Sequence, residues 1–266
     1  MNRIDRCFAD LKARNDKALV CFLTAGDPDF ATTAELVREI SSAGADIIEL
    51  GVPFSDPMAD GPSIQAATMR ALRAGATIKG VFDNVKQIRK QVQSTPIVLM
   101  TYFNPLYKYG MERFAADAAE AGVDGVILTD LPPEEAEEWH EISGKVGLAN
   151  IMLVAPTSTK ERIAIAANMG SGFIYCVSRL GVTGERNSIP AELSDLVGMI
   201  KTVTDLPVAV GFGISKPEHV GAVTEFADGA VVGSALVNII ASAAGSKDMV
   251  KRAGEFVKEL KTGVSG

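Results

Sequence analysis

Eight short apolar runs rich in β-branched residues recur along the chain, and each is followed by a turn and a segment with helical periodicity. The runs cover residues 18–24, 47–51, 97–101, 125–129, 150–154, 173–177, 208–211 and 230–233. Nearly continuous hydrophobicity is typical of strands covered on both faces, and regular strand–helix alternation indicates a parallel sheet. Eight such units predict closure into a (β/α)₈ barrel, with residues 1–266 forming a single domain.

A doubly wound open sheet is the main alternative to this TIM barrel, but no G-x-G-x-x-G motif follows the first apolar run. The first residues predict an extra N-terminal helix, because Ile4, Phe8 and Leu11 fall on one helical face. We expect this helix to close the bottom of the barrel. A second short helix is expected after the eighth strand, beginning at Ser234.

The composition excludes several classes of partner. Acidic residues outnumber basic ones by 33 to 26, and the lysines and arginines are scattered. The sequence therefore has no basic cluster of the kind that binds nucleic acid or an anionic membrane. No apolar run approaches the ~20 residues that span a bilayer. Cys7, Cys21 and Cys176 have no metal-ligand spacing and are typical of reduced core residues. We therefore expect a cytoplasmic protein with small molecules or proteins as partners.

The candidate catalytic groups follow from the architecture, since TIM-barrel active sites lie at the carboxyl ends of the strands. His140 and His219 fall in helical segments and no metal-ligand cluster is evident, so no metal site is predicted. No strand ends in a lysine that could form a Schiff base. Carboxylates remain: Glu49 interrupts an apolar strand, and Asp60 lies in the loop after it.

Each carboxylate also has a purely structural interpretation. Glu49 could be a buried acid satisfied by backbone donors or a salt bridge, and Asp60 precedes a glycine, as aspartate commonly does in turns. If Glu49 faces a mouth without water, burial raises its pKa, which suits a group that donates a proton and takes one back.

Glycine-rich turns after the seventh and eighth strands predict a phosphate site. The segments GFGIS (211–215) and VVGSA (231–235) place backbone N–H groups where they can reach an anion, and Ser234 begins a helix. Singly, such turns are ordinary. The polar, glycine-rich segment 178–190 is long for a barrel connection and predicts a lid, although it could be a simple connector.

Four segments carry a resemblance to a known family. ELGVPFSDPMADGP (49–62), YFNPLYKYG (102–110), SRLGVTG (178–184) and GFGIS are similar, in order and spacing, to the tryptophan synthase alpha subunit. The resemblance implies a TIM-barrel lyase that cleaves indole-3-glycerol phosphate to indole and glyceraldehyde 3-phosphate. It also implies an α2β2 complex, with pyridoxal phosphate only in the beta subunit and no cofactor in this chain.

The resemblance also implies roles for individual residues. Glu49 and Asp60 match the catalytic pair, and Thr183 matches the lid residue that meets the aspartate on closure. Substrate-binding positions are Phe22, Met100, Leu153, Tyr175, Thr183 and Phe212. Phosphate-binding positions are Gly184, Gly213, Gly233 and Ser234. The matching partner-facing positions are Pro53, Phe54, Asp56, Asn104, Pro105 and Pro132.

The sequence departs from the family pattern at three places: Met58 replaces a more usual leucine, Thr129 stands where a small apolar residue is common, and the variable lid position is Leu180. Two other functions remain open from the residues alone. One is a sugar-phosphate isomerase on the same scaffold, which needs no indole-sized apolar pocket. The other is a non-catalytic regulatory subunit that only binds a phosphorylated ligand.

The implied chemistry is compatible with a site that has neither a Schiff-base lysine nor a metal ion. A retro-aldol cleavage needs an electron sink, which a lysine imine or a metal ion often provides, and neither is predicted here. The indole ring can supply the sink itself, because protonation at its substituted carbon makes an iminium. Two carboxyl groups then suffice, with Glu49 protonating the ring carbon and Asp60 interacting with the ring N–H.

Overall fold

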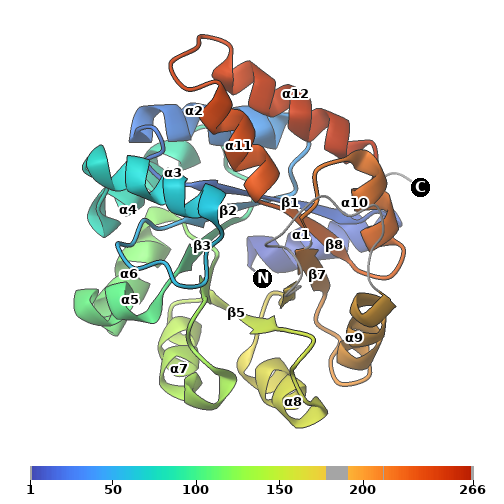
Figure 1. Cartoon of the computed structure of the whole chain (residues 1–266). Coiled ribbons are helices and arrows are strands. Elements are labelled where there is room, and N and C mark those ends of the chain that lie inside the picture. The colour runs from blue at the N-terminus through green and yellow to red at the C-terminus, as the bar shows by residue number, and fades with distance from the viewer. Residues whose placement is uncertain (1, 178–190, 212, 265–266) are drawn as a thin grey trace.

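The computed structural model describes residues 2–177, 191–211 and 213–264. Eight parallel strands form a closed barrel in the order β1-β2-β3-β4-β5-β6-β7-β8, and helices surround it (Figure 1). The strands are β1 (Ala18–Thr24), β2 (Ile47–Gly51), β3 (Ile97–Thr101), β4 (Gly125–Leu128), β5 (Ala149–Val154), β6 (Ile174–Val177), β7 (Val208–Gly211) and β8 (Gly229–Val232). The predicted TIM barrel is confirmed.

The helices are α1 (Arg3–Ala13), α2 (Phe30–Ser42), α3 (Pro62–Arg73), α4 (Ile78–Arg89), α5 (Phe103–Tyr109), α6 (Met111–Ala121), α7 (Glu137–Lys145), α8 (Lys160–Met169), α9 (Ala191–Lys201), α10 (Pro217–Thr224), α11 (Ser234–Ser242) and α12 (Met249–Lys261), with a 3₁₀ turn η1 (Pro133–Glu135). The connections after β2, β3 and β8 each contain two helices rather than one. The predicted helix after the eighth strand is α11. None of the described helices has the length and apolar character needed to cross a membrane.

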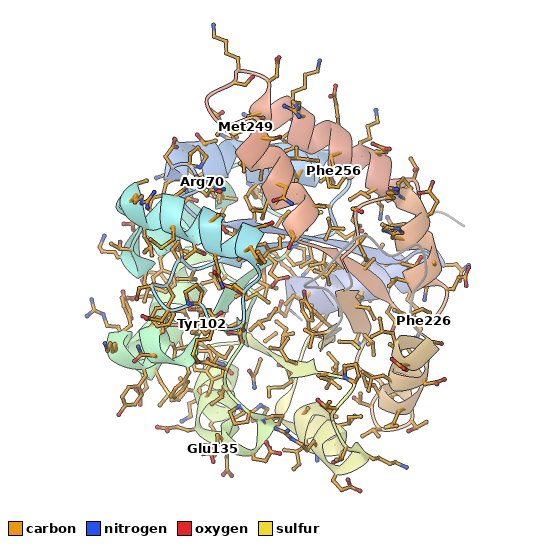
Figure 2. All side chains as sticks on the ribbon, in the orientation of Figure 1. Arg70, Tyr102, Glu135, Phe226, Met249 and Phe256 are labelled. Atoms are coloured by element: carbon orange, nitrogen blue, oxygen red, sulfur yellow. The ribbon has the colours of Figure 1, made fainter. Side chains whose placement is uncertain are left out.

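Alternation along the strands produces two apolar layers. In β1, Ala18 and Val20 pack inside the barrel, whereas Leu19, Cys21 and Leu23 pack outward against the helices. Figure 2 shows the side chains on the ribbon, in the orientation of Figure 1. The inner layer continues into α1, whose Ile4, Phe8 and Leu11 are buried against the barrel interior, as predicted. The amino-terminal end of the barrel is therefore closed by α1.

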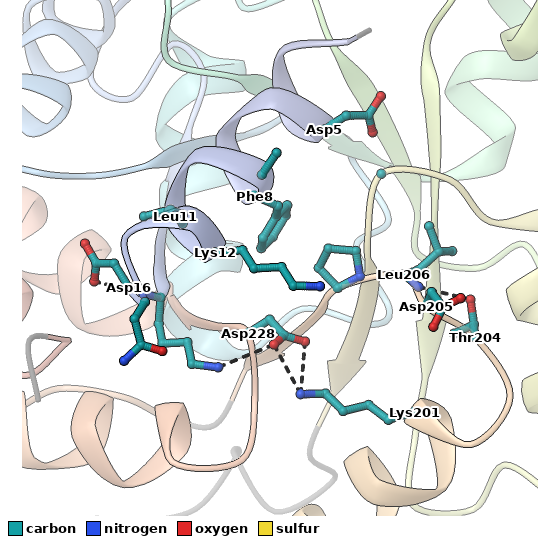
Figure 3. Close-up of a pocket in the computed structure, with 15 residues that line it drawn as sticks. Asp5, Phe8, Leu11, Lys12, Asp16, Lys201, Thr204, Asp205, Leu206 and Asp228 are labelled. Atoms are coloured by element: carbon teal, nitrogen blue, oxygen red, sulfur yellow. Dashed lines mark hydrogen bonds and ion pairs between the residues drawn. The ribbon is translucent and has the colours of Figure 1, made fainter.

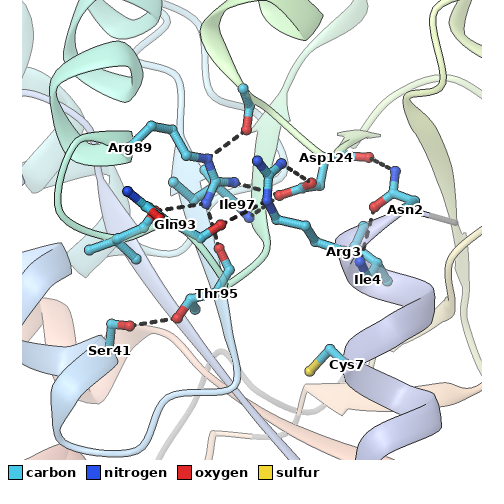
Figure 4. Close-up of polar contacts among 12 residues, drawn as sticks. Asn2, Arg3, Ile4, Cys7, Ser41, Arg89, Gln93, Thr95, Ile97 and Asp124 are labelled. Carbon is cyan, nitrogen blue, oxygen red and sulfur yellow. Dashed lines mark hydrogen bonds and ion pairs between the residues drawn. The ribbon is translucent and has the colours of Figure 1, made fainter.

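A buried ionic cluster anchors α1 to this closed end. Asp124 precedes β4, is 3% exposed, and accepts hydrogen bonds from the Arg3 and Arg89 guanidinium groups and from the Ile97 backbone N–H (Figure 4). Asn2 caps α1 and donates to the Asp124 carbonyl oxygen at 2.7 Å. One carboxylate thus connects α1, α4 and the start of β3.

A pocket of about 540 Å³ lies at the same end, between α1 and the α9–β7 connection (Figure 3). Lys201 and Lys17 each contact the Asp228 carboxylate, at 3.1 and 3.4 Å. Apolar parts of Phe8, Leu11 and Leu206 form the rest of its wall. The pocket lies at the opposite end of the barrel from the predicted catalytic residues.

We predict that Asp124→Ala lowers the free energy of unfolding by about 3–5 kcal/mol, because it leaves the buried Arg89 guanidinium without its carboxylate. Urea titration followed by circular dichroism measures the change. The control is Asp83→Ala, which breaks an exposed Lys79–Asp83 pair whose side chains are 75% and 57% exposed, and should cost no more than about 1 kcal/mol. Equal effects of the two substitutions would contradict the role of the cluster.

Candidate active site

Glu49 lies inside the carboxyl-terminal mouth of the barrel. It is two residues after Ile47, which packs in the inner layer, so the period of the strand directs Glu49 inward as well. The residue is only 1% exposed, and neither carboxyl oxygen has a hydrogen-bond partner among the described residues. The structural interpretation, in which backbone donors or a salt bridge would satisfy the buried Glu49 carboxyl, is therefore not supported by the described residues.

The side chains around Glu49 form the last inner layer of the barrel. Each follows an inner-layer residue of its own strand by two positions, as Phe22 follows Val20 and Tyr175 follows Phe173. Phe22 pairs with Glu49 across β1 and β2, and Leu153 pairs with Tyr175 across β5 and β6. The predicted pocket residues Phe22, Met100, Leu153 and Tyr175 thus face the interior near the carboxyl end of the barrel, as Glu49 does, whereas Phe212 lies outside the described residues.

Two glycines leave room for the rings in this layer. A Cβ on Gly51 would lie 2.7 Å from the Phe22 ring, and a Cβ on Gly211 would lie 2.8 Å from the Tyr175 hydroxyl. Such distances are shorter than real Cβ contacts, so any side chain here would displace a ring. The layer is consequently apolar and aromatic around a single acid.

This environment disfavours the charged form of Glu49. Burial, and secondarily the negative charge of Asp60, raise the pKa of the Glu49 carboxyl from its ordinary 4.5 to about 8. Glu49 also acts on its neighbours, since burial and then the Glu49 charge raise the pKa of Tyr175. At neutral pH, Glu49 is therefore a protonated acid with a proton available for transfer.

Asp60 lies above Glu49 in the β2–α3 loop, directly before Gly61, the N-cap residue of α3. Its carbonyl oxygen accepts from the Gln65 amide at 2.8 Å, and its backbone N–H donates to the Pro57 carbonyl oxygen at 3.2 Å. Burial raises the pKa of the Asp60 carboxyl to about 6, and the nearby Tyr102 hydroxyl partly offsets the rise. Asp60 therefore loses its proton at a lower pH than Glu49.

The predicted phosphate segments also lie at this mouth, since β7 and β8 are adjacent and parallel. Gly233 is the N-cap of α11 and has no side-chain cap, so the first N–H groups of α11, from Ser234 on, are free to meet an anion. Gly213 has φ +44° and no atom within 4 Å of where its Cβ would be. Thr183, Gly184 and the predicted lid lie outside the described residues.

Other sequence expectations have structural outcomes. His140 and His219 lie on α7 and α10 in the outer ring, as predicted, and His140 contacts the Met169 carbonyl oxygen at 2.8 Å. Within the described ranges, no three histidine, cysteine, aspartate or glutamate side chains group as metal ligands. The sequence interpretation missed Tyr102, although it begins the quoted segment YFNPLYKYG directly after β3.

The protein is a closed eight-stranded barrel, and two carboxyl groups of raised pKa lie at its catalytic end. These features define a TIM-barrel enzyme suited to acid–base chemistry. Comparisons with known proteins specify the family. The family model for the tryptophan synthase alpha chain matches residues 8–265. A tryptophan synthase alpha chain from Citrifermentans bemidjiense is 53% identical over 264 residues, which cover 99% of this chain and 98% of the relative.

Solved structures agree with the sequence comparison. The tryptophan synthase subunit alpha of Legionella pneumophila has a TM-score of 0.93 and 42% identity, covering 99% of this chain and 98% of the other. A chain from the ligand-free tryptophan synthase of Mycobacterium tuberculosis has a TM-score of 0.89 and 36% identity, covering 99% of both. The chain belongs to the tryptophan synthase alpha chain family. It is a lyase of tryptophan biosynthesis, which cleaves indole-3-glycerol phosphate.

The raised pKa of Glu49 predicts how stability depends on pH. The folded protein holds this proton up to about pH 8, whereas the unfolded chain releases it near 4.5, so wild-type stability falls as pH rises through that interval. Glu49→Gln abolishes this ionisation. The stability of the variant relative to wild type should therefore grow by roughly 1–4 kcal/mol from about pH 5 to about pH 8.

Urea titrations at several pH values measure this difference. Glu35→Gln is the control, because Glu35 is exposed on α2, and its difference from wild type should not change with pH. A constant difference between Glu49→Gln and wild type would show that the Glu49 carboxyl is ionised in the folded protein at neutral pH.

Proposed function

We propose that Glu49 and Asp60 are the catalytic residues of the retro-aldol cleavage, with protonated Glu49 as the acid and ionised Asp60 as its partner. The observation that supports this assignment is the burial of Glu49, without a described hydrogen-bond partner, near the carboxyl end of the barrel interior, where Phe22, Met100, Leu153 and Tyr175 also face inward. An indole ring bound in this layer meets the only acid there among the described residues.

The substrate is held from both ends. The phosphate binds at the free N–H groups of α11 and at Gly213. Gly184, which lies outside the described residues, is assigned to the phosphate by the family resemblance alone. The indole ring packs in the apolar layer. Phe212 and Thr183, which lie outside the described residues, are assigned to substrate binding by the family resemblance alone. Because the phosphate lies away from the reacting carbons, its binding energy positions them rather than entering the chemistry.

Glu49 then donates its proton to the ring carbon that bears the glycerol chain. This makes an indole iminium, and Asp60 stabilises the positive charge through the ring N–H. The electron pair of the breaking C–C bond flows into the iminium and restores the indole ring. The adjacent glycerol hydroxyl becomes the aldehyde as its proton returns to Glu49, so the enzyme ends the cycle in its starting state.

The two pKa values support this division of labour. Between about pH 6 and about pH 8, Asp60 is ionised while Glu49 is protonated. This is the combination that the proposed mechanism needs, and neither a metal ion nor a cofactor on this chain takes part in it.

We expect Glu49→Gln and Asp60→Asn each to lower kcat by at least about 100-fold, since a positioned acid or base contributes ~10²–10⁴. Both should bind indole-3-glycerol phosphate within a few-fold of wild type by calorimetry. Indole release, followed by absorbance, measures turnover, and exposed Asp83→Asn is the control. Near-normal turnover in either variant would remove that residue from the mechanism; isomerised sugar phosphate without indole would favour the isomerase.

The partner that we propose is a beta subunit that carries pyridoxal phosphate, in a cytoplasmic α2β2 complex with this chain as a single 1–266 domain. The matching positions Pro53, Phe54, Asp56, Asn104, Pro105 and Pro132 are all half-buried or exposed. Two large hydrophobic side chains are exposed in the same segments: Met58 is 88% and Tyr107 is 64% exposed. An apolar surface around the mouth supports a protein partner there.

This interface predicts that Met58→Asp weakens association with the beta subunit by at least about tenfold, because a charge would be buried in an apolar contact. Co-elution and titration of the two subunits measure it. Met199→Asp on α9 is the matched control, since Met199 is also exposed but lies away from these segments. Equal affinities of the two variants would place the interface elsewhere.

A further inference from the structure

The chain is held by hydrogen bonds on both sides of the Asp60 Cα. The Asp60 N–H donates to the Pro57 carbonyl oxygen at 3.2 Å, and the N–H of the preceding residue, Ala59, donates to the Tyr102 hydroxyl oxygen at 2.9 Å. On the other side, the Asp60 carbonyl oxygen accepts from Gln65 Nε2 at 2.8 Å. Of these three bonds, the one from Gln65 fixes the chain after Asp60.

The start of α3 explains why Gln65 reaches back to Asp60. Gly61 is the N-cap of α3 and has no side-chain cap, and the Gln65 N–H donates to the Gly61 carbonyl oxygen at 2.9 Å. Gln65 thus lies one turn into the helix. Because helical side chains lean toward the N-terminus of their helix, the Gln65 amide can bond the carbonyl oxygen of the residue before the cap.

The helix that carries Gln65 is itself anchored to the barrel. Its Ala67 and Ala71 side chains are fully buried, and Arg70, which is labelled in Figure 2, makes two hydrogen bonds to the Asp27 carboxylate, at 2.8 and 2.7 Å. Asp27 lies in the β1–α2 connection, and its side chain is 5% exposed. A two-point contact to a buried carboxylate fixes orientation as well as position. Gln65 therefore acts from a rigid support.

Burial does little to hold the loop before Asp60. Four of its residues are exposed: Ser55, Asp56, Met58 and Ala59. The contact between the Phe54 and Tyr102 rings, with centroids 5.4 Å apart, holds only the start of this stretch. Segments with few buried contacts open most easily. The hydrogen bonds around Asp60 are therefore what keeps this residue in a fixed place.

We propose that Gln65 is a positioning residue, whose amide fixes the Asp60 backbone and so directs the Asp60 carboxyl toward the indole N–H. Gln65 bonds the backbone rather than the carboxyl, so it acts on the position of Asp60. A displacement of about 1 Å at a catalytic group can cost about 100-fold in rate, and this bond removes such freedom. The importance of Gln65 for turnover rests on the proposed catalytic role of Asp60, but the backbone contact itself does not.

Gln65→Met tests this role, because methionine keeps the length of the side chain and removes its donor. We expect kcat to fall about tenfold with KM changed less than about twofold, since Gln65 is not among the groups proposed to bind substrate. Indole release measures both. Gln87→Met is the matched control, because Gln87 is exposed on α4 and accepts locally from Lys90 Nζ at 2.8 Å. An unchanged kcat in folded Gln65→Met, with Asp60→Asn inactive, would overturn the proposal.

Amide hydrogen exchange, followed by NMR, tests the contact independently of activity. The Ala59 and Asp60 N–H groups should exchange at least about threefold faster in Gln65→Met than in wild type, because the loop is held less firmly. The Ala67 and Ala71 N–H groups within α3 should exchange at their wild-type rates. Equal acceleration along α3 would show a general loss of helix stability and would contradict the positioning role.

Gln65→Glu separates the hydrogen bond from the shape of the side chain. Glutamate has the size of glutamine but at neutral pH offers a carboxylate oxygen where Nε2 donates. It should lose at least as much kcat as Gln65→Met, because two oxygens then face each other. A wild-type kcat in Gln65→Glu would exclude the donated bond as the cause.

The two proposals can fail separately. If Asp60→Asn keeps its turnover while Gln65→Met still speeds the exchange of the loop amides, the catalytic assignment is wrong and the backbone contact stands. If Asp60→Asn is inactive but Gln65→Met leaves both exchange and kcat unchanged, the positioning role is wrong and the catalytic assignment stands.

Discussion

The burial of one carboxyl group, Glu49, is the constraint on which the site depends. A carboxyl enclosed by apolar and aromatic side chains and lacking a described partner is far more stable with its proton than without it, and its pKa rises to about 8. The period of β2 directs Glu49 inward, and Gly51 and Gly211 leave space for the neighbouring rings. The local geometry thereby produces an acid at neutral pH without a metal ion or a cationic neighbour among the described residues.

The two ends of the barrel have different tasks. At the amino-terminal end, α1 fills the opening, and Asp124 connects it to α4 and β3 through paired charges. There the charges compensate one another and contribute to stability. At the other end, Glu49 lacks such compensation, and the negative charge of Asp60 raises the cost of ionising it. The buried acid therefore lowers stability at the catalytic end. The ion pairs of Asp124 at the closed end help to offset this loss.

Much of the fold could be predicted from the sequence, because strands covered on both faces are apolar along their whole length and β1 to β8 follow that pattern. The α1 face of Ile4, Phe8 and Leu11 followed from helical periodicity. The inward direction of Glu49 was an assumption, because a strand that is apolar along its whole length does not reveal which of its residues face the barrel interior. The short helix after β8 was predicted, but the paired helices after β2 and β3 were not, because surface helices depend on caps and short turns that the strand pattern does not contain. Tyr102 was missed for a related reason: its hydroxyl accepts the Ala59 N–H from a different connection, and only the folded barrel brings the two together. The lid residues and Phe212 lie outside the described residues, so their assignments stay predictions.

The most direct test is the ionisation of Glu49 itself. Protein labelled with carbon-13 at the glutamate side-chain carboxyl groups can be titrated by NMR, with the signal absent from Glu49→Gln identifying residue 49. We expect a midpoint near 8 for Glu49, well separated from those of the exposed glutamates. A midpoint close to the ordinary 4.5 would mean that Glu49 is ionised at neutral pH, and the proton it is proposed to donate to the indole ring would not be there.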